Sequence, residues 1–195
     1  GLTFARGLRS ILRHDPDKIM VGEIRDQDTA QIAVQAALTG HLVFTTVHAN
    51  NVFDVLGRFL HMGVDTYSLA SALVGIWAQR LVRVNCPECS SDFIPDAVLL
   101  QESGVTPEMA ATFKFRAGRG CGHCRGTGFK GRRAVAEFLI LNDMLREMIA
   151  NKQSILHLKE EARKLGTRTL REAALALVAS GDTTLGEINR VTLAS

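Results

Sequence analysis

The fold is decided by two apolar segments, Lys18-Ile19-Met20-Val21-Gly22-Glu23 and Leu42-Val43-Phe44-Thr45-Thr46-Val47-His48. Each begins with a short apolar run of the kind that forms a buried parallel strand. Between them, Asp28 or Thr29 is a suitable cap for a helix that runs to about Thr39 and stops at Gly40. Strand, helix and strand in this order predict an α/β protein with a parallel sheet.

The flanking sequence adds helices around this pair of strands. Apolar residues at helical spacing predict a helix from Phe4 to His14 that begins after Thr3 and is stopped by Asp15-Pro16. Further elements are expected as helices over 53–62 and 67–84, a helical patch near 107–115, a strand over 133–140, and short amphipathic helices over 142–195. The 67–84 segment reads as a buried helix, because its apolar part is far shorter than the roughly 20 residues of a membrane span.

Composition excludes several classes of protein. The chain has 195 residues, of which 46% are hydrophobic and 22% charged, with a formal net charge of +3. Such values are ordinary for a soluble globular protein, and the charge gives no support to a nucleic-acid or membrane partner. The N-terminal residues lack the features of a signal peptide. We therefore expect a cytoplasmic protein, and the absence of an initiating methionine suggests a fragment.

All four cysteines fall into two C-x-x-C pairs, Cys86/Cys89 and Cys121/Cys124, separated by 31 residues. Two residues between thiolates allow both sulfurs of a pair to reach one ion, so two pairs complete a closed four-thiolate Zn²⁺ site. His123 lies inside the second pair and could replace a cysteine. The alternatives are two disulfides or four unrelated cysteines; a reducing cytosol disfavours disulfides. A closed site of this kind would stabilise the fold and take no part in catalysis.

Polar residues follow both predicted strands. Glu23 ends the first strand, where ligands bind in open α/β sheets and where P-loop hydrolases carry the acid that positions Mg²⁺ or the attacking water. His48 ends the second strand and could donate a hydrogen bond to a γ-phosphate. Taken alone, a strand-end glutamate is more often a surface residue, and a loop histidine is more often structural.

The segment Leu12-Arg13-His14-Asp15-Pro16-Asp17-Lys18-Ile19-Met20-Val21-Gly22-Glu23-Ile24-Arg25-Asp26 resembles the signature of the type II/type IV secretion ATPase superfamily. Residues 39–48 resemble the His box of that family. The four cysteines resemble the tetracysteine loop of its secretion and pilus-extension branch, and the tail over 166–192 is also similar to that branch. The resemblance covers essentially the whole chain.

The resemblance implies a RecA-type core over 1–85, a tetracysteine zinc subdomain over 86–130, and a strand plus a helical C-terminal region over 131–195. It implies a homohexamer that hydrolyses MgATP. Its site residues would be catalytic Glu23 and His48, the zinc ligands Cys86, Cys89, Cys121 and Cys124, and, as candidates for nucleotide contact, Arg13, Arg25 and Arg80. No G-x-x-x-x-G-K-[ST] motif occurs in the sequence, so the chain alone is expected to bind ATP poorly and to be inactive.

Two functions are therefore compared. The first is a motor of type II secretion or type IV pilus assembly, cytoplasmic and held peripherally at the inner membrane by platform and recruitment proteins, without nucleic acid and without a membrane span. The second is a non-catalytic, zinc-stabilised docking module on a degenerate ATPase fold.

Overall fold

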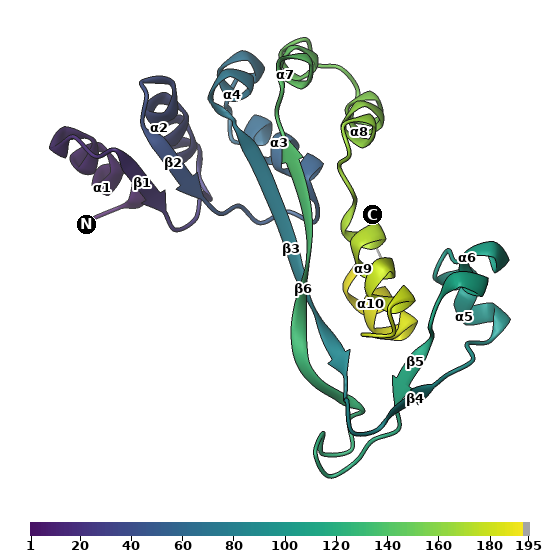
Figure 1. Cartoon of the computed structure of the whole chain (residues 1–195). Helices are drawn as coiled ribbons and strands as arrows, with labels where there is room; N and C mark the ends of the chain where they lie inside the picture. The colour runs from purple at the N-terminus through teal and green to yellow at the C-terminus, as the bar shows by residue number, and fades with distance from the viewer. Residues whose placement is uncertain (193–195) are drawn as a thin grey trace. The chain divides into compact units, whose positions relative to one another are not determined.

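A computed structural model describes residues 1–192 of the chain (Figure 1). These residues form two compact units, each made of two separate stretches of sequence: 1–77 with 138–167, and 78–137 with 168–192. We call them the first and the second unit. The segment 86–130 falls wholly within the second unit, whereas residues 131–195 are shared between the two.

The first unit is an α/β structure. Its elements are α1 (Phe4–Ile11), η1 (Leu12–His14), β1 (Lys18–Val21), α2 (Gln27–Leu38), β2 (Leu42–Thr45), α3 (Val52–His61), α4 (Thr66–Ala72), α7 (Asp143–Ala150) and α8 (Ile155–Lys164). β1 and β2 pair in parallel with Lys18 opposite Leu42 and Val21 opposite Thr45, which confirms the predicted strand pairing.

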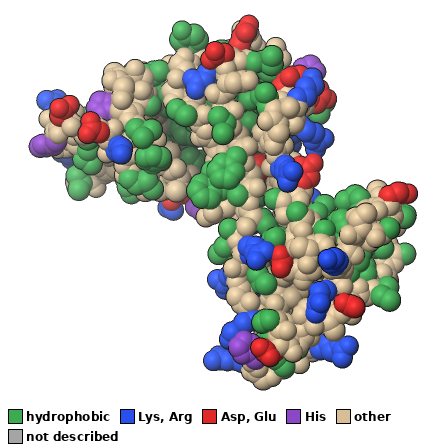
Figure 2. All heavy atoms as spheres, viewed as in Figure 1, with side chains coloured by type: hydrophobic (Ala, Val, Ile, Leu, Met, Phe, Trp, Pro, Cys, Tyr) green, Lys and Arg blue, Asp and Glu red, His purple; other side chains and the backbone are tan. Residues whose placement is uncertain are grey.

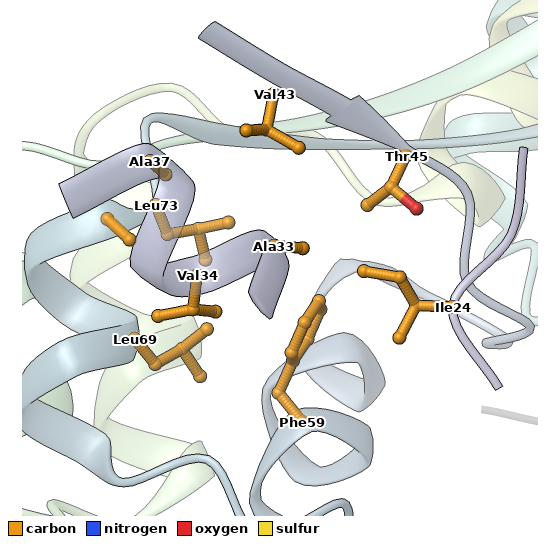
Figure 3. A pocket seen from close by; sticks show the side chains of 10 residues that line it. Ile24, Ala33, Val34, Ala37, Val43, Thr45, Phe59, Leu69 and Leu73 are labelled. Carbon is orange, nitrogen blue, oxygen red and sulfur yellow. The ribbon is translucent and has the colours of Figure 1, made fainter. Parts of the chain in front are cut away.

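Only one face of this two-stranded sheet is well covered. Ile19 and Val21 are buried, whereas Met20 and Phe44 are 66% and 53% exposed. The expectation of two buried strands is therefore wrong for residues 1–192, because the described elements cover one face only. On the covered side α2, α3 and α4 surround a small pocket of about 70 Å³ lined by apolar side chains and Thr45 (Figure 3). The chemistry of this lining is that of a packing gap.

Side-chain caps set the helix starts. The Thr3 hydroxyl accepts from the Arg6 N–H and begins α1, as predicted. The second helix begins earlier than expected: Asp26, and neither Asp28 nor Thr29, is its cap, and its carboxylate accepts from the Thr29 N–H at 2.8 Å. The helix therefore starts at Gln27, three residues after Ile24. A short connection of this kind fixes where the segment after β1 can lie.

The predicted helix over 67–84 is wrong in its second half. α4 ends at Ala72, and β3 (Gly75–Asn85) occupies the rest. Gly75 weakens a helix at this point, and Ile76, Val82 and Val84 favour a strand. β3 pairs with β6 (Phe129–Ile140), which begins four residues earlier than expected. The boundary between the units falls within both strands.

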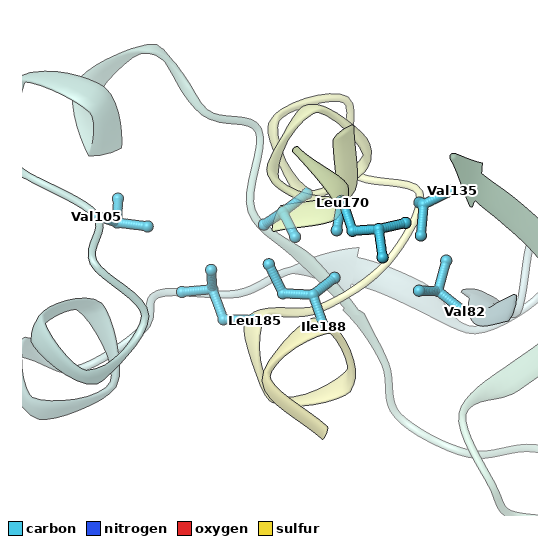
Figure 4. Close-up of a cluster of buried hydrophobic side chains, with 8 residues drawn as sticks. Val82, Val105, Val135, Leu170, Leu185 and Ile188 are labelled. Carbon is cyan, nitrogen blue, oxygen red and sulfur yellow. The ribbon is translucent and has the colours of Figure 1, made fainter. Parts of the chain in front are cut away.

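The second unit is built around a core of its own. It contains the antiparallel pair β4 (Ser90–Asp92) and β5 (Arg116–Gly118), and the helices α5 (Ala97–Glu102), α6 (Pro107–Thr112), α9 (Leu170–Ala179) and α10 (Leu185–Thr192). α9 and α10 pack their apolar faces on β3 and β6: Leu170, Leu185 and Ile188 cluster with Val82 and Val135 (Figure 4). The C-terminal helices predicted from amphipathic spacing are confirmed up to residue 192, and the prediction for 193–195 lies outside the described residues.

Within residues 1–192, every helix is too short or too polar to cross a bilayer.

Candidate functional site

The carboxyl ends of β1 and β2 stay joined beyond the last paired residues. The Ile24 N–H donates to the Thr46 carbonyl at 3.1 Å, and the Thr46 hydroxyl donates to the Gly22 carbonyl at 2.6 Å. These two bonds bracket Glu23 and hold it against the chain that leads to His48. The parallel pairing thus brings two residues 25 positions apart in sequence to the same edge of the sheet.

Glu23 lies between two basic side chains. Its Oε2 is 2.5 Å from Nη2 of Arg25, and its Oε1 is 2.9 Å from Nε2 of His48. The Glu23 side chain is 19% exposed, whereas Arg25 and His48 are 72% and 84% exposed. The hydrogen bond from Arg25 lowers the pKa of Glu23, so the group is a carboxylate at neutral pH.

One oxygen of this carboxylate has no donor. Oε1 is buried, and although His48 Nε2 is near it, the approach lies outside hydrogen-bonding geometry, so the atom accepts no hydrogen bond among the described residues. A buried acceptor in this state can take a proton from a water molecule or bind a divalent cation. Glu23 is thus chemically suited to the role that its position suggests.

The three arginines predicted to contact nucleotide lie in different parts of the structure. Arg25 contacts Glu23 directly. Arg13 lies in η1, before the amino end of β1, while Glu23 follows its carboxyl end. Arg80 lies on β3 in the second unit and donates to the Gln79 carbonyl at 3.1 Å. Of these three arginines, Arg25 is the one for which residues 1–192 show a contact with Glu23.

The four cysteines converge in the second unit. Their sulfur atoms all lie within 4.8 Å of one another, with Sγ–Sγ distances of 3.9 Å for Cys86–Cys121, 3.9 Å for Cys89–Cys124 and 3.8 Å for Cys121–Cys124. Four thiolates at Zn–S distances of about 2.3 Å would be about 3.8 Å apart in a tetrahedron. The cysteines are free, and these separations are far longer than the roughly 2 Å of a disulfide. The donor set therefore fits a tetrahedral metal ion.

Backbone amides favour the thiolate form at this centre. Cys124 Sγ accepts from the N–H groups of Cys121 at 3.2 Å and Gly128 at 3.3 Å, and these bonds lower the pKa of Cys124 to about 6. Burial raises the pKa of Cys89 to about 12. A cation at the centre would hold all four sulfurs deprotonated. Zn²⁺ is the ion that this geometry and ligand set suit best, and it would supply folding stability without catalysis.

Glycines allow two stretches of backbone to approach each other closely beside the four cysteines. The backbone at Gly118 passes so near Gly128 that a Cβ at Gly118 would lie 2.0 Å from the Gly128 carbonyl oxygen. The same carbonyl accepts from the Cys86 N–H at 2.9 Å. In the sequence, the two glycines that follow the second C-x-x-C pair, Gly126 and Gly128, are the feature that indicates such a close approach of backbone.

Comparison with known proteins agrees with these features. The model of the family described as "Type II/IV secretion system protein" matches residues 1–190. A type IV pilus assembly ATPase PilB of Thermus thermophilus is 46% identical over 96% of this chain and 21% of its own length. A type II secretion system protein E of Pseudomonas aeruginosa is 44% identical over 98% of this chain and 38% of its own length. The chain thus spans about a fifth to two fifths of these relatives.

A solved structure is also similar. The crystal structure of the pilus retraction motor PilT with bound ADP superimposes on this chain with a TM-score of 0.67. The two sequences are 26% identical, and the match covers 98% of this chain and 44% of the PilT chain. The α/β fold is therefore similar to that of PilT. From the family match over nearly its whole length and from these relatives, the chain belongs to the type II/IV secretion system protein family.

Proposed function

We propose that this chain forms part of a hexameric ATPase motor that drives type II secretion or type IV pilus assembly. The observation that carries the proposal is the convergence of Glu23 and His48 at the carboxyl edge of β1 and β2, with a buried Glu23 oxygen that accepts no hydrogen bond from residues 1–192. The names of the relatives support the same activity, since they are pilus assembly ATPases and secretion proteins. The core would be of the RecA type.

In this proposal Glu23 acts on the attacking water and helps to place Mg²⁺. Mg²⁺ bound with ATP would neutralise charge on the phosphates, and the Glu23 Oε1 would accept a proton from water. His48 would leave Glu23 and donate to the γ-phosphate. Arg25 would hold Oε2, so that Oε1 stays free for the water. Arg13 and Arg80 are retained as candidates for contact with nucleotide.

The phosphates themselves need a cradle that residues 1–195 lack, since no G-x-x-x-x-G-K-[ST] motif occurs among them. We infer that this loop belongs to polypeptide outside these residues and that the chain alone does not turn over ATP. The working protein would be cytoplasmic and would reach the inner membrane through platform and recruitment proteins.

The test is steady-state ATP hydrolysis by a polypeptide in which this chain is joined to a phosphate-binding loop. We expect Glu23→Gln to lower kcat by at least about 100-fold, the range typical of a lost general base, because the amide cannot accept the proton. Glu160→Gln on α8 is the matched control and should leave kcat unchanged. Unchanged turnover in Glu23→Gln would refute the assigned role. Absence of turnover in the unsubstituted protein would favour the docking module.

A further inference from the structure

The segment between Met109 and Ala136 differs in charge from the rest of the chain. It contains seven Lys and Arg residues and no Asp or Glu, although the whole chain has a net charge of only +3. The remaining residues of the second unit therefore carry a net negative charge. Along the sequence of this unit, charge is divided into a basic stretch that contains the second C-x-x-C pair and an acidic remainder, which includes Glu88 of the first pair.

Four of these basic residues lie within eight positions of the second C-x-x-C pair in sequence, and we call them the basic collar: Arg119, Arg125, Lys130 and Arg132. Arg119 is anchored by its N–H to the Cys89 carbonyl at 3.0 Å, and Arg125 directly follows Cys124. Lys130 Nζ lies 3.4 Å from the His123 carbonyl, and Arg132 is two residues further along β6. Figure 2 shows Lys and Arg side chains near a His at the lower end of the view, with one acidic side chain beside that His.

The collar is exposed, and none of its cations takes part in an ion pair described for residues 1–192. All four side chains are exposed, and the ion pairs described for residues 1–192 include none of them. Arg133, by contrast, pairs with Asp182 at 2.5 Å and is not part of the collar. The contacts of the collar are with neutral groups, such as the Ser91 hydroxyl at 2.9 Å from Arg119 Nε.

A neutralising role for the metal centre does not account for the collar. Four thiolates around Zn²⁺ carry a net charge of about −2, and Glu88 inside the first C-x-x-C pair adds one negative charge, so the sum is still smaller than the charge of four cations. The Sγ atoms of Cys121 and Cys124 receive backbone N–H groups and sulfur contacts, and no collar side chain is among their described partners. The collar therefore directs its charge to the exterior.

We propose that the basic collar is a docking surface for an acidic polypeptide segment of a partner protein. The Ser91 contact orients Arg119, and fixed arginines suit the paired oxygens of carboxylates. A lipid bilayer fits less well, because the large apolar side chains of 109–136 are buried or half-buried, so that none is placed to insert between lipids. The proposal goes beyond the motor function and does not require nucleotide.

The test uses the full chain with bound zinc and a fluorescein-labelled peptide of ten glutamates, measured by fluorescence anisotropy. We expect saturable binding that weakens as salt rises from 50 to 300 mM, since exposed charges are screened over about 8 Å at physiological salt. Lys130→Glu/Arg132→Glu should weaken the binding at least tenfold. The control Arg9→Glu/Lys18→Glu removes the same charge from the first unit and should change it less than twofold.

Two further measurements keep the proposal open to refutation. Zinc content and thermal unfolding report whether the charge reversal still folds, and Lys130→Gln/Arg132→Gln removes the charge without adding acid and should weaken binding at least threefold. Equal losses in the collar and control variants would overturn the proposal. Tighter binding to vesicles of anionic phospholipid, or to a 20-residue oligothymidine, would overturn it in favour of a membrane or a nucleic acid. None of these binding measurements uses ATP, so their outcome is independent of the ATP hydrolysis experiment that tests the motor proposal.

Discussion

At the scale of single residues, Glu187 is a buried charge whose partners are described. Its side chain has no exposed surface, and it accepts from Arg83 at 2.7 Å and from Arg190 at 2.8 Å, as well as from the Arg83 N–H at 3.0 Å. Burial alone would raise the pKa of Glu187, but the hydrogen bonds from Arg190 and Arg83 outweigh it and lower the pKa to about 2. The carboxylate thus connects α10 to β3.

Replacing Glu187 by Gln should destabilise the chain by about 3 kcal/mol, because the buried acceptor of two arginines loses its charge. The matched control is Glu161→Gln, which breaks an exposed pair with Lys164 and should cost less than about 1 kcal/mol. Urea unfolding followed by fluorescence gives both values. Equal effects of the two substitutions would show that the Glu187 network is energetically no different from a surface pair.

The same residue makes stability depend on pH. The folded pKa of Glu187 is lowered from 4.5 to about 2, so its contribution is complete above about pH 4.5 and is lost as pH falls towards 2. The full contribution is on the order of 3 kcal/mol, from 1.4 kcal/mol for each pKa unit. Urea midpoints measured between pH 6 and pH 3 should therefore fall more steeply for the unsubstituted chain than for Glu187→Gln. Parallel slopes would contradict the assignment.

At the scale of elements, the close approach of the end of β5 to Gly128 requires a residue without a side chain at position 118. We expect Gly118→Ala to push the Gly128 carbonyl away, and so to displace both Cys86, whose N–H donates to that carbonyl, and the Gly128 N–H, which donates to Cys124 Sγ. The control is Gly122→Ala, where nothing lies within 4 Å of the added Cβ. Zinc affinity, measured by competition with a chelator, should fall at least tenfold for the first substitution and less than threefold for the second.

Elements were predictable where one local signal decided them. Thr3, Asp15-Pro16 and Gly40 mark helix ends within their own few residues, and the two parallel strands are short apolar runs of the predicted kind. The prediction of a helix after Ala72 is wrong because the apolar residues of this segment fit the roughly 3.6-residue period of a helix as well as the two-residue period of a strand. The choice is made by β6, which is remote in sequence and supplies the pairing partner of β3. Only Gly75 and the β-branched residues gave a local hint of the strand.

The candidate sites show the same division. The four cysteines of the candidate metal site could be identified from spacing alone, because two residues between cysteines determine the geometry of each pair. Glu23 and His48 could be named from their positions after strands, but their contact could not. The contact depends on the bonds of Thr46 to Gly22 and Ile24, which exist only once β1 and β2 are in register.

At the scale of the whole molecule, the two units draw on distant parts of the sequence. Contacts across about 100 residues, such as Thr183 Oγ1 to the Arg83 carbonyl at 2.7 Å, join the C-terminal helices to β3. Asn85, which precedes Cys86, donates its backbone N–H to the Asp182 carbonyl at 2.7 Å and its side-chain amide to the Gly181 carbonyl at 2.9 Å. Sequence periodicity contains no information about such pairings, so the composition of the units could not be foreseen.

These contacts predict how the chain responds to loss of metal. Because Cys86 follows Asn85 directly, release of the metal should loosen both the cysteine loops and the turn at 181–183, while the first unit, which has its own core, keeps its structure. Hydrogen exchange measured by mass spectrometry before and after chelation should show protection lost in 85–128 and 180–188 and retained in 27–38 and 143–150. The variant Cys124→Ser should reproduce this pattern without chelator. Uniform loss of protection would mean instead that the two units unfold as one, and retained protection at 181–183 would mean that the metal loops are not coupled to the C-terminal helices through Asn85.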